Sequence, residues 1–347
     1  MKNISKSLDW DIIEKETGWI YSKLIDDIVI TSRVRIARNL KGYPFPHNMT
    51  LEISKKVEEI LIKLFLKLPY KKTFVINISS LTEKQKNSLI EKHIISREFS
   101  ENELCNKIVI MPEKKTSIMI NEEDHLRIQV IFPGLNLRKC LKIINEIDDY
   151  IDKNLDYAFL PNLGYLTACP TNIGTGLRSS VLIHIPGIRF FKKDKIIFKN
   201  IQSIGITIRG FYGEGSLPFG SIFQISSTET TGKTENEIIE ELESVVKLIK
   251  EEEKDCIEKI KEDKNLKKKI EEKIMKILKQ EKSNGQFDDF FSLLTISYLS
   301  GILDIKKYEL KNLFFYLLEN NEKNKDYIFQ GKKGKILKKE ILERLNV

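Results

Sequence analysis

The sequence predicts an α+β fold, in which a largely antiparallel sheet is flanked by helices and is followed by a bundle of helices. Two patterns along the 347 residues indicate this. Up to Gly232, short β-branched runs at hairpin-like spacing alternate with helical patterns, which favours an antiparallel sheet. After Gly232 the pattern is almost wholly helical. We therefore expect two domains, over residues 1–232 and 233–347.

Strands are expected where short apolar runs are rich in β-branched residues and bounded by turn residues. A further strand is expected around Arg33 and Arg35, which alternate with apolar residues. Because alternate side chains of a strand point to one face, these two guanidinium groups would point the same way. The runs that meet the first criterion are KIVIM (107–111), SIMI (117–120), LRIQVIF (126–132), VLIHI (181–185), GITIRG (205–210) and SIFQIS (221–226).

Helices are expected where apolar residues recur every three or four positions and where a capping box precedes them. A charged, amphipathic stretch opens after Gly232 and runs to about Lys282, where Ser283-Asn284-Gly285 ends it. A short, lysine-rich terminal helix completes the bundle. The other helical signals are the periodic segments 51–68, 137–155, 290–303 and 308–318, and the capping boxes at Thr82–Gln85 and Thr234–Glu237.

The composition is that of an ordinary globular protein, with 41% hydrophobic and 31% charged residues. The sequence has no apolar run of membrane-spanning or signal-peptide length, so we expect a cytoplasmic protein. Four widely spaced cysteines, without a C-x-x-C pair, are expected to be reduced thiols. The net charge of +8 arises largely where lysine and glutamate interleave, as on a solvated helix face, so charge alone does not indicate nucleic acid.

Five arginines lie where predicted strands meet loops. Arginine suits phosphate because its planar fork donates two parallel, charge-assisted hydrogen bonds. Each one alone would be an ordinary surface ion pair. If the five guanidinium groups converge, they would form a site that binds an anion. The five arginines are Arg33, Arg35, Arg127, Arg178 and Arg209.

Two further segments carry chemistry. Asn121–Arg127 packs three carboxylates, an imidazole and a guanidinium between two apolar strands, and is either a solvated polar turn or a carboxylate pair facing a cationic substrate. Cys169–Thr175 (CPTNIGT) places a thiol and a rigid turn shortly before Arg178. The arrangement in Cys169–Thr175 is typical of a functional site and not of a hydrophobic core.

Other motifs are weaker. The glycine-rich loop Arg209–Ser216 allows close backbone approach to a ligand, but no crossover helix follows it as in a Rossmann fold. Thr231–Thr234 (TGKT) is not a P-loop, because the first glycine of that motif would fall on Ser227. His93, near the end of a predicted helix, has no role that spacing alone indicates.

Together these residues resemble the ATP:guanido phosphotransferase family, whose signature C-P-[ST]-N-[ILV]-G-T is matched at every position by Cys169–Thr175. The blocks Ser32–Arg35 and Asn121–Arg127 are similar to that family too. Within it the loop RGFYGEGS, followed by GSIFQIS, looks most like the bacterial protein-arginine kinases. Because the SRVR block begins at Ser32, we expect that the helical domain which helps to enclose a free guanidino substrate in small-molecule kinases of the family does not precede it. The RD-x-x-RA motif that recognises phosphoarginine is not evident, since Lys333–Lys338 stands in its region.

The resemblance implies transfer of the γ-phosphoryl of ATP, carried with Mg²⁺, to the guanidinium of arginine residues in proteins. It implies a guanido-kinase-like catalytic domain over 1–232 and a dimerising or regulatory domain over 233–347. Implied partners are protein substrates with exposed arginines, a stress-response repressor, a zinc-finger activator, a Clp-type unfoldase and a second copy of the chain, but no membrane and no nucleic acid.

The resemblance also assigns residues to roles. The catalytic carboxylate would be Glu123, and Cys169 would contact the acceptor guanidinium as a thiolate, which nearby positive charge favours. Glu214 would lie near the acceptor, and His93 beside the adenine. The nucleotide phosphates would be held by Ser32, Arg33, Arg35, Arg127, Arg178 and Arg209.

Three other hypotheses stay open on the sequence. The first is a kinase for free arginine or a related guanidino metabolite. The second is a noncatalytic regulatory scaffold, which would not need Cys169, Glu123 and all five arginines. The third is a basic nucleic-acid-binding protein, which would bind in a salt-dependent way without nucleotide turnover.

Overall fold

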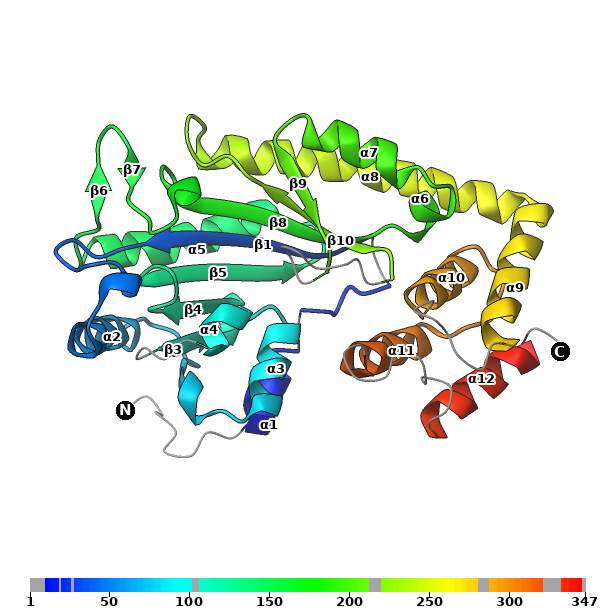
Figure 1. Ribbon diagram of the computed structural model, residues 1–347, viewed down its shortest axis with the longest axis horizontal. Helices are drawn as coiled ribbons and strands as arrows, with labels where there is room; N and C mark the ends of the chain where they lie inside the picture. Colours follow the sequence, from blue (N-terminus) through cyan, green and yellow to red (C-terminus); the bar gives the residue numbers. More distant parts are fainter. Residues whose placement is uncertain are drawn as a thin grey trace.

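The computed structural model describes residues 10–18, 20–25, 28–101, 106–211, 220–279, 287–320 and 332–344. Among them, an eight-stranded antiparallel sheet has the order β2-β3-β4-β5-β1-β8-β10-β9 (Figure 1). Its strands are β1 (Val29–Arg38), β2 (Phe74–Asn77), β3 (Lys107–Met111), β4 (Thr116–Ile120), β5 (Leu126–Pro133), β8 (Leu177–His184), β9 (Ile206–Arg209) and β10 (Ile222–Ser227). A short hairpin, β6 (Phe159–Leu160) and β7 (Gly164–Tyr165), stands apart from this sheet.

Helices cover the sheet and continue beyond it. Seven of those described precede the long helix α8: α1 (Trp10–Glu16), α2 (Leu51–Phe65), α3 (Glu83–Glu91), α4 (Arg97–Glu101), α5 (Leu137–Asp152), α6 (Pro186–Phe190) and α7 (Asp194–Gln202). The others are α8 (Glu235–Glu262), α9 (Lys264–Lys279), α10 (Phe287–Leu299), α11 (Lys307–Asn320) and α12 (Lys332–Arg344).

The two faces of the sheet differ in chemistry, and strand alternation sets the difference. On β1, Val34 and Ile36 are buried and join one apolar core with α5 and α8, for example with Ile144 and Leu242. The side chains between them, Arg33 among them, turn to the opposite face. The same strand therefore supplies both the core and a row of cations.

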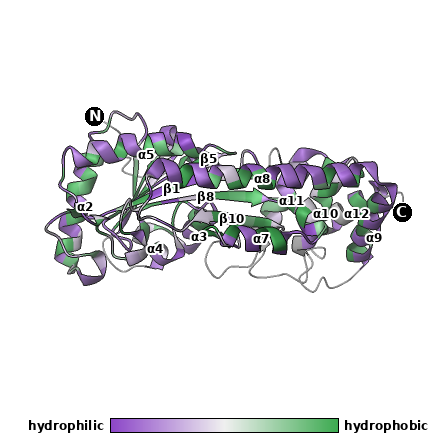
Figure 2. Ribbon diagram, turned by 90° about the horizontal axis from the view of Figure 1, so that it is seen from above, coloured by the Kyte–Doolittle hydropathy of each residue, from purple (hydrophilic) through white to green (hydrophobic). Residues whose placement is uncertain are grey.

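The long helix α8 links two apolar cores. Its first turns, including Leu242 and Val246, pack with the sheet, whereas Ile257 and Ile260 near its end belong to the core of the C-terminal helices. Seen from above, α8 extends alongside the strands and the C-terminal helices gather at the end opposite α2 (Figure 2). The division at residue 232 stays a prediction, and α8 is the element that joins the parts on either side of it.

An aromatic cluster fastens the C-terminal helices to the rest of the protein. The ring of Phe314 on α11 lies 5.4 Å from Tyr21, 6.0 Å from Phe211 and 5.6 Å from Phe291 on α10, measured between centroids. Such tilted and edge-on pairs add to the free energy of burying the rings. The C-terminal part of the chain thus contacts the segment before β1 through Tyr21 and the end of the segment after β9 through Phe211.

Most predicted elements are confirmed, including both capping boxes, at Thr82 and Thr234. The charged helical stretch differs, because it breaks at Asp263 into α8 and α9. Asp263 has an extended backbone, and its carboxylate accepts the N–H groups of Asn265 and Leu266, as a helix N-cap does. The break expected at Ser283-Asn284-Gly285 lies outside the described residues. Among the described strands and α-helices, those not predicted are β2, β6, β7, α1, α4, α6 and α7.

No helix in the described part of the chain is both long and apolar enough to span a membrane.

Candidate active site

Five arginines share the face of the sheet opposite the α5–α8 core. On β1, Arg35 stands directly across from Arg178 of β8, and Arg33 lies two residues before it. On the other side of β1, Arg127 of β5 pairs with Ala37, which lies two residues after Arg35 and therefore on the same face. Arg209 of β9 pairs with Gln224 of β10, which accepts a 3.0 Å hydrogen bond from Arg33. Directly opposed residues share a face, so the predicted convergence of these arginines is present.

The arginines repel one another. Burial lowers the pKa of Arg33 to about 9, with help from Arg127 and Arg209. Burial also lowers the pKa of Arg35, and Arg33 and Arg127 lower it further. For Arg178, burial and then Arg209 lower the pKa. Because a guanidinium stays protonated in proteins, these shifts report an electrostatic strain that a bound anion would relieve.

Neutral groups hold two of these guanidinium groups in place. Arg33 donates from Nε to Ser180 Oγ at 3.1 Å, in addition to its bond with Gln224. Arg178 donates from Nε to Asn172 Oδ1 and from Nη2 to Thr171 Oγ1, both at 2.7 Å. These partners orient the forks without neutralising their charge. The positive charge therefore remains available to a ligand.

The turn between β4 and β5 carries two glutamates with different surroundings. Glu122 forms an ion pair with Arg127 and accepts a 2.5 Å hydrogen bond from Ser96. Burial raises the pKa of Glu122, but Arg127 and Ser96 outweigh it and leave the pKa lowered. Glu123 is exposed, and among the described residues its carboxylate has no hydrogen-bonding or ion-pair partner. Glu122 is thus the ion-pair partner of Arg127, whereas the side chain of Glu123 is exposed.

Glu123 is also the more basic of the two. Although the residue is exposed, partial desolvation of its carboxylate raises its pKa first, and the neighbouring carboxylates of Asp124 and Glu122 raise it further. Arg127 and Arg178 act in the opposite direction without reversing the shift. A raised pKa makes this carboxylate a better proton acceptor than an ordinary glutamate.

Asp124 ties the acidic turn to the signature loop. Its Oδ1 accepts hydrogen bonds from Asn39 Nδ2 at 2.6 Å and from the main-chain N–H of Ala168 at 2.7 Å. Asn39 Nδ2 also donates to the carbonyl of Leu166 at 3.0 Å. The chain entering Cys169 is therefore fixed relative to Glu123 through buried polar groups.

His125 is part of this frame. Its Nδ1 accepts the N–H of Leu40 at 2.9 Å, and its Nε2 lies 2.8 Å from the carbonyl of Pro44. This arrangement fits the neutral tautomer with the proton on Nε2, and burial lowers the pKa of His125. Its imidazole supports the backbone and does not face the arginines.

Cys169 begins the signature loop, which contains the short helix η4 (Pro170–Asn172). The thiol is half-buried, with Sγ 3.0 Å from Thr171 Oγ1. That hydroxyl also accepts the bond from Arg178, so a single group links Cys169 to the arginine face. Gly174, with φ of 111°, is needed because a Cβ there would lie 2.3 Å from the carbonyl oxygen of Thr230.

His93 lies beside the arginine face, just past the end of α3. Its backbone is left-handed, with φ of 54°, and its carbonyl accepts a 2.9 Å hydrogen bond from Gln129 Nε2. Its ring lies 5.2 Å from that of Phe211. Burial lowers the pKa of His93 to about 3, and Arg33 and Arg35 contribute. The imidazole is therefore neutral at physiological pH.

Two of the predicted site residues are not in this group. Ser32 is buried on the opposite face, where its Oγ donates to the carbonyl of Gly134 at 2.8 Å and accepts the N–H of Asn136 at 2.9 Å. Its hydroxyl braces the turn before α5 and not the arginine face. Glu214 lies outside the described residues. By strand alternation the hydroxyl on the arginine face is that of Thr31, two residues before Arg33.

Sequence reasoning missed several supporting residues. Glu122 was grouped with its neighbours and not recognised as the partner of Arg127. Asn39 and Thr230 carry no motif, and their roles depend on contacts between distant segments. Thr171 and Asn172 lie within the signature, which was the available signal for the groups that orient Arg178.

The donor set fits a polyphosphate better than a metal ion held by protein. Among the described residues, no cluster of three or more His, Cys, Asp or Glu side chains could hold a metal. Mg²⁺ prefers a few carboxylates together with phosphate oxygens and water. The arginine face, with carboxylates at its edge, suits a nucleotide that carries its own metal.

The chain is similar to known proteins of one family. A family model described as ATP:guanido phosphotransferase, C-terminal catalytic domain, matches residues 52–256, more than half of the chain. The chain therefore belongs to the ATP:guanido phosphotransferase family, and it is an ATP-dependent phosphotransferase.

Several relatives carry the name protein-arginine kinase. The one from Bacillus cereus (strain B4264) is 43% identical over 252 residues, which is 72% of this chain and 71% of the relative. The one from Clostridium novyi (strain NT) is 43% identical over 264 residues, which is 75% of this chain and 76% of the relative.

Solved structures confirm the fold class. Lombricine kinase aligns with a TM-score of 0.57 and 27% identity over 65% of this chain and 66% of that chain. The substrate-free duplicated taurocyamine kinase from Schistosoma mansoni aligns with a TM-score of 0.56 and 26% identity, over 69% of this chain and 35% of that one. This chain thus spans less than two thirds of the length of either structure.

The repulsion within the arginine face gives a prediction for Arg35→Gln. Removing one repelled charge should raise the thermal unfolding midpoint of the free protein, whereas ATP affinity should fall about tenfold or more, because a hydrogen bond to a charged group contributes about 1.5–3 kcal/mol. Calorimetry measures both quantities. The control is Arg138→Gln, an exposed arginine on α5, which should leave ATP affinity unchanged. A lower midpoint with unchanged ATP affinity would contradict the assignment.

Proposed function

We propose that this protein is a protein-arginine kinase, which transfers the γ-phosphoryl group of ATP to the guanidinium of arginine residues in proteins. The observation that carries the proposal is the arginine face, bordered by an outward carboxylate and a thiol linked to Arg178. Membership in the ATP:guanido phosphotransferase family supports the reaction. The relatives named protein-arginine kinase support the choice of acceptor.

On the nucleotide side, the arginines would align the phosphates and neutralise their charge. Phosphoryl transfer requires mainly such positioning and electrostatic stabilisation. The hydrogen bonds from Arg33 and Arg178 to neutral partners would support this alignment. Mg²⁺ carried by ATP would help to offset the negative charge of the phosphates. His93, neutral and next to the arginines, would adjoin the adenine.

On the acceptor side, Glu123 would orient the guanidinium and take its proton late. A guanidinium pKa lies above about 12 and that of an ordinary glutamate near about 4.3, so prior deprotonation is negligible. As the N–P bond forms and the bond from phosphorus to the leaving ADP oxygen breaks, the nitrogen becomes acidic. Its proton then passes to Glu123, whose pKa is raised by burial and by Asp124. The product is a phosphoramidate.

Cys169 would position the acceptor without a covalent intermediate. Its Sγ lies next to Thr171 Oγ1, which also contacts Arg178, so a cation held by the thiol would sit close to the phosphate side. Glu214 stays a prediction for the acceptor side. The remaining inferences from the family resemblance also stay predictions: residues 1–232 as the catalytic domain, 233–347 as a dimerising or regulatory domain, cytoplasmic localisation, and the repressor, activator and unfoldase as partners.

A kinase for a small guanidino compound is the second candidate. The aligned structures named lombricine kinase and taurocyamine kinase favour it. Their identity to this chain is 26–27%, against 43% for the relatives named protein-arginine kinase. The acceptor is therefore the property that an experiment must separate.

The deciding experiment incubates the protein with Mg-ATP and a denatured, arginine-rich protein, with free arginine offered in parallel. Mass spectrometry under conditions that preserve acid-labile phosphoarginine then identifies the product. We expect phosphate on arginine side chains of the protein acceptor. Phosphorylated free arginine alone would indicate the second candidate. Phosphate on serine alone, or on neither acceptor, would contradict the proposal.

The role of Glu123 gives a second prediction. Glu123→Gln keeps the shape of the side chain but removes the proton acceptor, so turnover should fall about 10²-fold or more. ATP affinity should change little, because the phosphates contact the arginines. The control is Glu146→Gln, an exposed carboxylate on α5 that pairs with Lys114. Near-normal arginine phosphorylation by the Glu123 variant would show that the assignment is wrong.

A further inference from the structure

The segment that joins β10 to α8 has no part in the roles above. It runs from Thr228 to Lys233 and contains most of the TGKT string that is not a P-loop. In the folded protein it lies against the signature loop Cys169–Thr175, more than fifty residues earlier in the chain. Its contacts therefore bear on the position of Cys169 and Arg178.

Thr230 is the centre of these contacts. It is 4% exposed, and its Oγ1 lies 2.7 Å from the carbonyl oxygen of Ile173 and 3.0 Å from that of Thr171. Its own carbonyl accepts the N–H of Thr175 at 3.0 Å. The close approach at Gly174 brings the two backbones together at the same point. Thr230 thus fixes the signature loop at three of its seven residues.

The loop that Thr230 fixes is the one that orients the catalytic groups. Thr171 and Asn172 hold the guanidinium of Arg178 by two 2.7 Å hydrogen bonds. Thr171 Oγ1 also lies 3.0 Å from the thiol of Cys169. A shift of the loop backbone would therefore move a phosphate ligand and an acceptor contact together.

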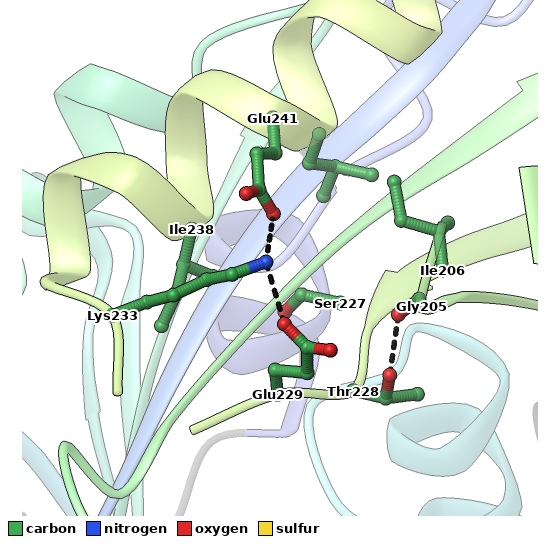
Figure 3. A pocket seen from close by; sticks show the side chains of 9 residues that line it. Gly205, Ile206, Ser227, Thr228, Glu229, Lys233, Ile238 and Glu241 are labelled. Carbon is green, nitrogen blue, oxygen red and sulfur yellow. Dashed lines mark hydrogen bonds and ion pairs between the residues drawn. The ribbon is translucent and has the colours of Figure 1, made fainter. Parts of the chain in front are cut away.

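Polar contacts hold the segment Thr228–Lys233 to α8 and to the turn before β9 (Figure 3). Lys233 Nζ lies 2.5 Å from Glu229 Oε2 and 2.7 Å from Glu241 Oε2 on α8. These hydrogen bonds raise the pKa of Lys233. Thr228 donates its hydroxyl to the carbonyl of Gly205, in the turn before β9. Thr230 is consequently held against the sheet and α8 while it contacts the loop.

We propose that Thr230 is a positioning residue for phosphoryl transfer, which sets the signature loop so that Arg178 and Cys169 face the reacting groups. It touches neither substrate and acts through Thr171 and Ile173. The proposal rests on the proposed function for its activity readout. A misplacement of about 1 Å by a residue outside the chemistry can reduce turnover about 10²-fold.

The test uses three variants. Thr230→Val keeps the side-chain shape but removes the hydroxyl, whose one hydrogen is shared between the carbonyl groups of Thr171 and Ile173. Thr230→Ser keeps a hydroxyl at this position. Thr228→Val makes the same change on the same segment, where the hydroxyl contacts Gly205 instead of the signature loop. Turnover of arginine phosphorylation is one readout. The other is amide hydrogen exchange of the peptide that covers residues 169–175, which needs no substrate.

We expect Thr230→Val to lower kcat about tenfold or more and to speed exchange in residues 169–175 by a similar factor. Thr230→Ser and Thr228→Val should stay within about threefold of wild type in both readouts. The inference is overturned if Thr230→Val keeps normal exchange, or if Thr228→Val loses as much activity. If the wild type forms no phosphoarginine, the proposed function fails, and the exchange readout still decides whether Thr230 fixes the loop.

Discussion

The crowding of like charges on one face of the sheet is the constraint on which the rest of the structure depends. Arg33 and Arg35 lie on one strand, with Arg178 directly opposite, and burial together with mutual repulsion lowers their pKa values. An arrangement of this kind persists only if other contacts determine the backbone. Here the reverse face of β1 does so, because Val34 and Ile36 are locked in the core with α5 and α8.

The remaining elements of the site orient these charges without neutralising them. Serine, glutamine, threonine and asparagine side chains hold Arg33 and Arg178, so these hydrogen bonds leave positive charge that an anionic ligand would compensate. Arg127 is different, because Glu122 pairs with it and leaves Glu123 outward. Preorganised, uncompensated charge in a partly buried site is what phosphoryl transfer requires, and its cost to the stability of the free protein is typical of functional sites.

Local patterns in the sequence predict much of this arrangement. The alternation in TSRVR places Arg33 and Arg35 on one face, and the capping boxes at Thr82 and Thr234 mark two helix starts correctly. The same alternation turns Ser32 away, so its hydroxyl could have been assigned to the opposite face. Convergence with Arg127 and Arg209 could not be derived in this way, because it depends on the strand order around β1, which long-range pairing decides.

Contacts between distant segments explain the other omissions. Thr230 contacts backbone carbonyl groups of the signature loop. Every residue has such a carbonyl group, so the sequence does not indicate which of them accepts a hydrogen bond from a distant segment. His93 reaches the arginine face through a left-handed backbone after α3, a conformation that is uncommon for residues other than glycine. The C-terminal helices likewise reach the site through Phe211, which packs between His93 and Phe314.

We propose that the arginine face binds the phosphates of ATP. Calorimetric titration with ATP, ADP and AMP, each with Mg²⁺, tests this proposal most directly. If the arginines hold the phosphates, affinity should fall by about tenfold or more with each phosphate removed, since every lost charge-assisted hydrogen bond contributes about 1.5–3 kcal/mol. Equal affinities for the three nucleotides would mean that binding depends on the adenosine and would contradict the account.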